Sequence, residues 1–289
     1  MQLLPKVPAK FFKPFRIEAS QGLLIISNTH CGDSSRNPGY GDYLASHLDS
    51  LSTQVVVVLN GDVGRDSDCL ELYPYDITSW STPTIRFWLS VGGFIGRGGT
   101  VYLIPATHNR PLERWYAEQL AGGQFCLADY PAWRAELPPN LGEEHQTFLS
   151  WLGQIRLAPS LVVTVGNKTL LVDHGNTFDD ILPWYHAYLQ LTRRWRGIPR
   201  EGSRFGKPLN GAFILNLFRG IERQYAKRAQ EYGCTTVLLG HWHCPGRQHT
   251  LDGVTVIVAS LCTDGACVVG QVLPNGKVLL HDLLAGPTH

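Results

Sequence analysis

Residues 238–246 read LLGHWHCPG, and the interpretation of the whole sequence starts from this stretch. An apolar run over residues 236–239 stops at Gly240, after which His241 and His243 follow with one residue between them. Alternate side chains of an extended strand leave the same side, so the pattern predicts two neighbouring imidazoles at a strand end. Such a pair is typical of a metal site, and a chance pair of surface histidines fits the same pattern equally well.

Four more predicted strands end in polar clusters. The strands are the apolar runs at residues 22–27, 54–59, 100–105 and 169–172. The residues that follow them are Asn28-Thr29-His30, Asn60-Gly61-Asp62, Ala106-Thr107-His108-Asn109 and Asp173-His174-Gly175-Asn176. In layered α/β folds the carboxyl ends of strands share one edge of the sheet, where ligands bind. Five such ends therefore predict one convergent polar site.

The remaining pattern completes an α/β fold. Gly166-Asn167 and Asn275-Gly276 predict hairpin turns, the first between strands at residues 161–165 and 169–172. Further strands are expected at residues 254–259, 266–272 and 278–283. Helices are expected at residues 42–51, 143–155 and 218–232, the last with a core-facing apolar stripe and a capping Gly233.

Composition restricts the class of protein. With 289 residues, 44% hydrophobic and 17% charged, the sequence is typical of a folded globular chain. The net charge of +1 provides no general attraction to nucleic acid or an anionic membrane. No apolar run approaches the roughly 20 residues of a membrane span, and prolines and lysines near the N-terminus interrupt any signal-like region. Seven cysteines without a CxxC pair favour reduced thiols, so we expect a cytoplasmic protein.

Residues 1–20 form a separate basic and aromatic arm in the sequence. Its lysines and phenylalanines could contact a membrane surface peripherally or bind a partner. The alternative, which we favour, is an extension that packs along the first strand, at residues 22–27.

The ordered strand ends resemble the five motifs of the calcineurin-like metallophosphoesterase superfamily, which run D-x-H, G-D-x-x-[DE], G-N-H-[DE], H-G and G-H-x-H. The resemblance covers roughly residues 22–283. It implies a four-layer α/β/β/α sandwich of two mixed sheets with a helical cap insertion. The branch that looks most similar is the UDP-2,3-diacylglucosamine pyrophosphatase-like one. On this basis residues 21–289 would form one domain, with an insertion at 110–159 and a cap at 178–211.

The resemblance also implies a site for two divalent metal ions, which could be manganese, iron or zinc, with manganese favoured. Asp62 would bridge the two ions. The other implied ligands are Asn28, His30 and His243 for the first ion and Thr107, His174 and His241 for the second. His108 matches the family's acid-side catalytic histidine, and Asn109 occupies the position of the carboxylate that orients it. The implied reaction is in-line attack of a metal-activated water on a phosphodiester or pyrophosphate bond.

Three positions depart from the family motifs, and they leave two functions open. Asn28 replaces a carboxylate but keeps an oxygen able to ligate, Thr107 replaces an asparagine, and Asn109 replaces a carboxylate. Loss of the carboxylate that orients a catalytic or metal-binding histidine can by itself lower metal affinity or activity roughly 10–100-fold. The retained His108 favours a hydrolase. Thr107 and Asn109 favour a catalytically impaired pseudo-phosphoesterase that binds a nucleotide, nucleic acid or protein.

The predicted cap indicates the class of substrate. Arginines and aromatic residues are concentrated within residues 178–211. Arginine binds phosphate through paired hydrogen bonds, and aromatic faces stack on bases or cover acyl chains. The candidate substrate-binding residues are Trp184, Arg193, Arg194 and Arg196. A small phosphorylated substrate is therefore expected, with a solvated basic helix as the alternative reading. The near-zero net charge disfavours an extended nucleic-acid channel.

Overall fold

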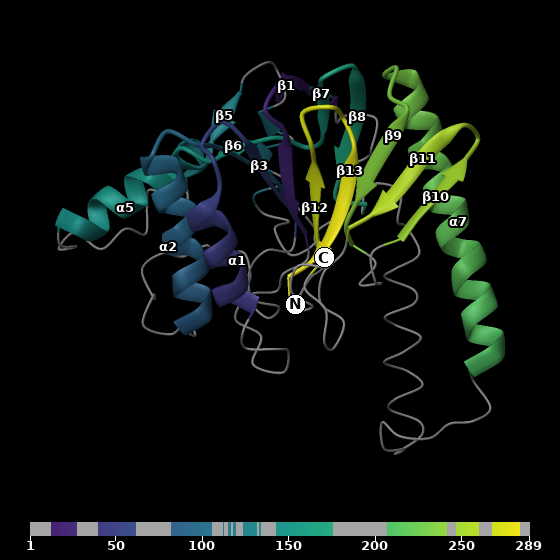
Figure 1. Cartoon of the computed structure of the whole chain (residues 1–289), viewed down its shortest axis with the longest axis horizontal. Helices are drawn as coiled ribbons and strands as arrows, with labels where there is room; N and C mark the ends of the chain where they lie inside the picture. The colour runs from purple at the N-terminus through teal and green to yellow at the C-terminus, as the bar shows by residue number, and fades with distance from the viewer. Residues whose placement is uncertain are drawn as a thin grey trace.

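The computed structural model describes residues 13–27, 40–61, 82–105, 124–131, 143–175, 207–241, 247–259 and 268–283, together with residues 112, 115, 116, 118, 119 and 133. Within these ranges two β-sheets lie face to face, and helices cover the outer face of each (Figure 1). The chain thus has the four-layer α/β/β/α architecture with two mixed sheets that the resemblance implied. The helical cap predicted at 178–211 lies almost entirely outside the described residues.

The first sheet has seven strands in the order β13-β12-β2-β3-β4-β6-β5. Their bounds are β2 Leu23–Ile26, β3 Val56–Asn60, β4 Thr100–Ile104, β5 Phe125–Cys126, β6 Arg156–Leu157, β12 Val268–Val272 and β13 Val278–Asp282. Strands β2, β3, β4 and β6 run parallel to one another. Their carboxyl ends therefore point to the same edge.

The second sheet has six strands in the order β1-β7-β8-β9-β11-β10. Their bounds are β1 Phe15–Glu18, β7 Leu161–Val165, β8 Lys168–Asp173, β9 Thr236–Leu239, β10 Arg247–Leu251 and β11 Val254–Val258. Strands β8, β9 and β11 are parallel, whereas β7 and β10 are antiparallel to their neighbours β8 and β11.

The helices form the two outer layers. Helices α1 (Tyr40–Ser50), α2 (Thr82–Gly96) and α5 (Glu143–Gly153) lie on the seven-stranded sheet, together with the short 3-10 helix η4 (Leu127–Asp129). Helix α7 (Lys207–Glu231) covers the six-stranded sheet on the opposite flank (Figure 1). Every helix in the described ranges, α7 included, is too short or too polar to traverse a bilayer.

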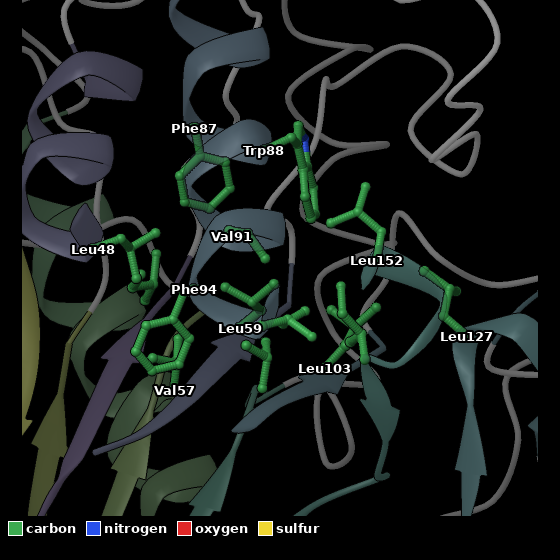
Figure 2. Close-up of a cluster of buried hydrophobic side chains, with 14 of the residues drawn as sticks. Leu48, Val57, Leu59, Phe87, Trp88, Val91, Phe94, Leu103, Leu127 and Leu152 are labelled. Atoms are coloured by element: carbon green, nitrogen blue, oxygen red, sulfur yellow. The ribbon is translucent and has the colours of Figure 1, made fainter. Parts of the chain in front are cut away.

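Side-chain alternation divides the buried residues into three cores. Odd positions of β2, such as Leu23 and Ile25, contribute to the core between the two sheets, whereas Leu24 and Ile26 face the helices. Figure 2 shows the helix-facing core, where Phe87, Trp88, Val91 and Phe94 of α2 pack over Val57, Leu59 and Leu103 of the sheet. The third core lies beneath α7, where Ile221, Tyr225 and Ala229 meet Leu171 and Leu239.

Most predicted elements are confirmed. The predicted strands at residues 22–27, 54–59, 100–105, 161–165, 169–172, 236–239, 254–259, 266–272 and 278–283 correspond to β2, β3, β4, β7, β8, β9, β11, β12 and β13. Both predicted hairpin glycines have positive φ, 57° at Gly166 and 76° at Gly276, and so does the helix-capping Gly233, at 74°.

One interpretation of the N-terminal arm is wrong. Residues 15–18 do not pair with the strand at 22–27; as β1 they pair in parallel with β7 of the other sheet. The reason is burial, because Phe15 and Ile17 pack against the core between the sheets. The rest of the sequence up to residue 12 lies outside the described residues.

Candidate metal centre

Four strand ends meet at the carboxyl edge of the space between the sheets. By alternation Ser27, Asn60, His174 and Gly240 follow inner-face positions of β2, β3, β8 and β9, respectively. The amide of Gly240 donates to the carbonyl of His174 at 2.9 Å. A Cβ atom added to Gly240 would lie 3.0 Å from the Ser27 side chain, so these two strand ends approach as closely as a glycine allows. The convergence predicted from the sequence is therefore present for these four ends.

His174 is held in a defined orientation. Its side chain is fully buried, and Nδ1 lies 2.8 Å from the backbone carbonyl oxygen of Asn60. A carbonyl oxygen can only accept, so Nδ1 carries the hydrogen and, in the neutral ring, Nε2 carries the lone pair. A neutral imidazole whose other nitrogen donates to a backbone carbonyl is a common arrangement of metal-binding histidines.

His241 lies directly beside His174. The two ring centroids are 5.0 Å apart, and the ring planes are inclined at 63°. His241 is buried and its backbone has a φ of 62°, in the left-handed region that residues other than glycine rarely adopt. Such a conformation costs roughly 1–3 kcal/mol and persists where the surrounding structure imposes it, often at functional sites. The resemblance implied that His174 and His241 share one metal ion, whereas this backbone conformation was not predicted; the neighbouring pair predicted at His241 and His243 includes a residue outside the described ranges.

Asp173, the first residue of the motif that contains His174, contributes to the loop that carries this histidine. The carboxylate oxygen Oδ1 accepts a hydrogen bond from the amide of Gly175 at 2.9 Å. Gly175 has a φ of 109°, a conformation that favours glycine. Asp173 thus stabilises the turn that follows β8.

Two buried polar atoms at this edge have no hydrogen-bond partner among the described residues. They are the hydroxyl oxygen of Ser27 and the side-chain oxygen Oδ1 of Asn60. Leaving such an atom unsatisfied costs about 1–3 kcal/mol. Because an unsatisfied buried oxygen lowers stability, the presence of Ser27 and Asn60 at these positions requires another explanation. Both atoms belong to residues that directly precede predicted motif positions.

The predicted site residues divide into two groups. His174 and His241 are described, and they lie in contact. The others lie outside the described residues: Asn28, His30, Asp62, Thr107, His108, Asn109, Trp184, Arg193, Arg194, Arg196 and His243. Within the described part of the chain, no cluster of three or more His, Cys, Asp or Glu side chains is arranged to hold an ion. Two adjacent buried imidazoles, one with its Nε2 lone pair fixed, nevertheless fit a divalent transition metal.

Asn60 begins one of the predicted polar clusters, but the sequence assigned it no role in the site. Its Nδ2 donates to the carbonyl oxygen of Asp173 at 3.1 Å, across the space between the two sheets. The sequence signal was a polar side chain at the inner-face end of an otherwise apolar strand, VVVLN. Its partner could not be inferred, because it belongs to the other sheet.

Comparison with known proteins gives no family assignment. No protein-family model and no curated protein matches the chain. Solved structures that it is similar to include a predicted phosphoesterase from Streptococcus pneumoniae TIGR4, with 13% identity over 91% of this chain and 97% of that chain and a TM-score of 0.34. An archaeal phosphodiesterase shares 12% identity over 90% of this chain and 99% of that one, with a TM-score of 0.38. Zinc-bound Vps29 from Entamoeba histolytica shares 10% identity over 92% of this chain and 94% of that chain, with a TM-score of 0.37.

Proposed function

We propose that the chain is a metal-dependent phosphoesterase of the calcineurin-like type, which hydrolyses a phosphodiester or pyrophosphate bond in a small anionic substrate. The observation that carries the proposal is the contact between His174 and His241 at the carboxyl edge between the sheets. These histidines follow strands β8 and β9, at two of the positions where the motif resemblance implies metal ligands.

The chain's own residues would prepare this site in two ways. The carbonyl of Asn60 holds the ring of His174 with Nε2 as the coordinating nitrogen. Burial of His174 and His241 excludes water from their surroundings, which strengthens electrostatic interactions with an ion or an anionic substrate. Bound divalent ions would supply Lewis acidity toward the phosphoryl oxygens.

The remaining parts of the proposal come from the motif resemblance. Asp62 would bridge two ions, with manganese favoured over iron and zinc, and His108 would act on the leaving-group side. Arginines of residues 178–211 would bind the substrate phosphate. The branch most similar in motif arrangement suggests a nucleotide-linked pyrophosphate as one substrate to try.

Metal analysis and a hydrolysis assay test the proposal together. We expect purified protein to bind about two manganese, iron or zinc ions per chain and to hydrolyse bis(p-nitrophenyl) phosphate when supplied with Mn²⁺. His174→Ala and His241→Ala should each lower metal content and reduce turnover by about 100-fold or more, since a lost ligand removes several kcal/mol of transition-state stabilisation.

A matched histidine provides the control. His281→Ala changes a half-buried histidine on the edge strand β13 and should leave metal content and turnover unchanged. Bound metal without hydrolysis of any diester or diphosphate would indicate a pseudo-phosphoesterase, as the replacements at Asn28, Thr107 and Asn109 suggest. Protein that binds no divalent metal would contradict the proposal itself.

A further inference from the structure

We infer that Asn60 is a positioning residue that fixes the orientation of His174 from the opposite sheet. The inference deepens the proposed function and rests on it for the role of His174 as a ligand. Asn60 is the last residue of β3 in the seven-stranded sheet, whereas His174 follows β8 in the six-stranded sheet. Both residues are completely buried.

Asn60 holds His174 at two points. Its side-chain Nδ2 donates to the carbonyl oxygen of Asp173 at 3.1 Å, which fixes the peptide plane that leads into His174. Its own backbone carbonyl accepts from Nδ1 of the His174 ring at 2.8 Å. The bond to the Asp173 carbonyl therefore fixes the backbone position of His174, and the bond to Nδ1 fixes the rotation of its ring. Because Nδ1 and Nε2 belong to one rigid planar ring, a fixed Nδ1 also fixes the direction of Nε2.

A third bond completes the arrangement. The amide of Gly240 on the neighbouring strand end donates to the carbonyl oxygen of His174 at 2.9 Å. The peptides on either side of the His174 Cα are thus each held by a different strand end. Of the three bonds, the one made by the Asn60 side chain depends on residue type, and the other two use backbone groups that any residue supplies.

Core stability does not explain an asparagine at this position. Val58, two residues earlier on the same face of β3, packs in the apolar core between the sheets. Asn60 continues this face, yet its Oδ1 is buried without a hydrogen-bond partner among the described residues. A leucine of similar shape would avoid that unsatisfied oxygen. The amide is explained by the bond from Nδ2 to the loop that carries His174.

Nitrogen-15 NMR of the imidazole rings tests the inference without requiring metal or turnover. In metal-free wild-type protein, His174 should be the Nδ1–H tautomer, with a ring proton that exchanges slowly with water. Asn60→Leu keeps the branching of the side chain and removes the donor. We expect ring-proton exchange to become at least about 10-fold faster, and Mn²⁺ binding to weaken by about 10–100-fold, as for other residues that orient metal-binding histidines.

Val58→Ala is the matched control, because it weakens the same core on the same strand face and leaves the Asn60 side chain in place. It should lower stability while leaving the His174 ring proton and Mn²⁺ affinity unchanged. Equal ring-proton exchange in Asn60→Leu and Val58→Ala would overturn the inference. If Asn60→Leu does not fold, Asn60→Ala, which also removes the Nδ2 donor, takes its place in the same comparison with Val58→Ala, and an Nε2–H tautomer of His174 in the wild-type protein would also overturn the inference.

The two proposals can fail separately. A protected Nδ1–H that is lost in Asn60→Leu supports the positioning role even if the protein binds no Mn²⁺, in which case the phosphoesterase proposal fails alone. Metal binding and hydrolysis that survive unchanged in Asn60→Leu would support the phosphoesterase and overturn the positioning role.

Discussion

His241 combines a proposed metal-ligand position with an unfavourable backbone conformation. Its φ of 62° is one of two positive values among non-glycine residues in the described part of the chain, the other being that of Asp252. Asp252 lies in a β-turn-like connection where aspartate tolerates this conformation. At His241 the side chain, not the backbone, explains the choice of residue, because the ring is placed against His174.

This conformation predicts an order of stability for two substitutions. Both His241→Ala and His241→Gly remove the ring, but only alanine retains a Cβ that opposes positive φ. We expect the glycine variant to be more stable by about 1 kcal/mol, although glycine normally lowers stability. Urea unfolding of the metal-free proteins measures the difference. Equal stability, or a more stable alanine variant, would show that φ changes once the ring is removed.

Helix α2 shows how packing overrides helix propensity at the scale of an element. The helix contains Gly92, Gly93 and Gly96, which weaken a helix in isolation. Gly92 is buried, and a Cβ there would lie 2.7 Å from the ring of Phe148 on α5. A Cβ at Gly96 would lie 2.8 Å from Trp151. Gly92 and Gly96 therefore allow α2 and α5 to approach closely.

Adjacent glycines of α2 should consequently respond to alanine in opposite ways. Alanine gains up to about 1 kcal/mol in helix propensity at either position. At Gly92 the clash with the buried Phe148 ring should exceed this gain, because overpacking costs about 1–3 kcal/mol, so Gly92→Ala should destabilise the protein. At Gly93 the nearest atom is 3.7 Å from the added Cβ, so Gly93→Ala should stabilise it. Thermal or urea unfolding of both variants tests the prediction. Stabilisation by Gly92→Ala would mean that the two helices can separate without loss.

At the scale of the whole molecule, residues from distant parts of the chain meet on the seven-stranded sheet as well as at the candidate metal centre. His47 of α1 and His281 of β13 interact electrostatically, although 233 residues lie between them in the sequence. Their Nε2 atoms are both buried without a hydrogen-bond partner among the described residues. Burial, and secondarily the charge of His281, lowers the pKa of His47 below its usual 6.5.

This lowered pKa predicts an acid-sensitive fold. Below pH 6.5 the unfolded chain binds a proton at residue 47 more readily than the folded chain does. The contribution of His47 to stability should be fully present above pH 6.5 and decline as the pH falls toward the lowered pKa. Replacing His47 by Gln should flatten the pH dependence of the urea midpoint between pH 7.5 and 5. An unchanged pH dependence in His47→Gln would exclude this residue as the cause.

The sequence could not predict every element, and the omissions share a cause. Strand β10 reads RQHTL, too polar to be recognised as a strand, and it is stabilised by pairing along β11. Helix α2 was not predicted, and its glycines are explained only by α5, which lies about 50 residues later in the sequence. In both elements, residues of another strand or helix explain the structure that the local sequence did not predict.

The sequence by itself determined the buried strands, their hairpins and the polar residues at their ends, because strand periodicity and turn chemistry act over a few neighbouring residues. It thereby also placed His174 and His241 at strand ends. Only the tertiary structure decided that β1 joins the second sheet, that the two histidine rings meet at 5.0 Å, and that Asn60 bonds to the loop of His174. These features depend on how two sheets pack face to face, and the sequence of a strand does not identify which residue of the other sheet it will meet.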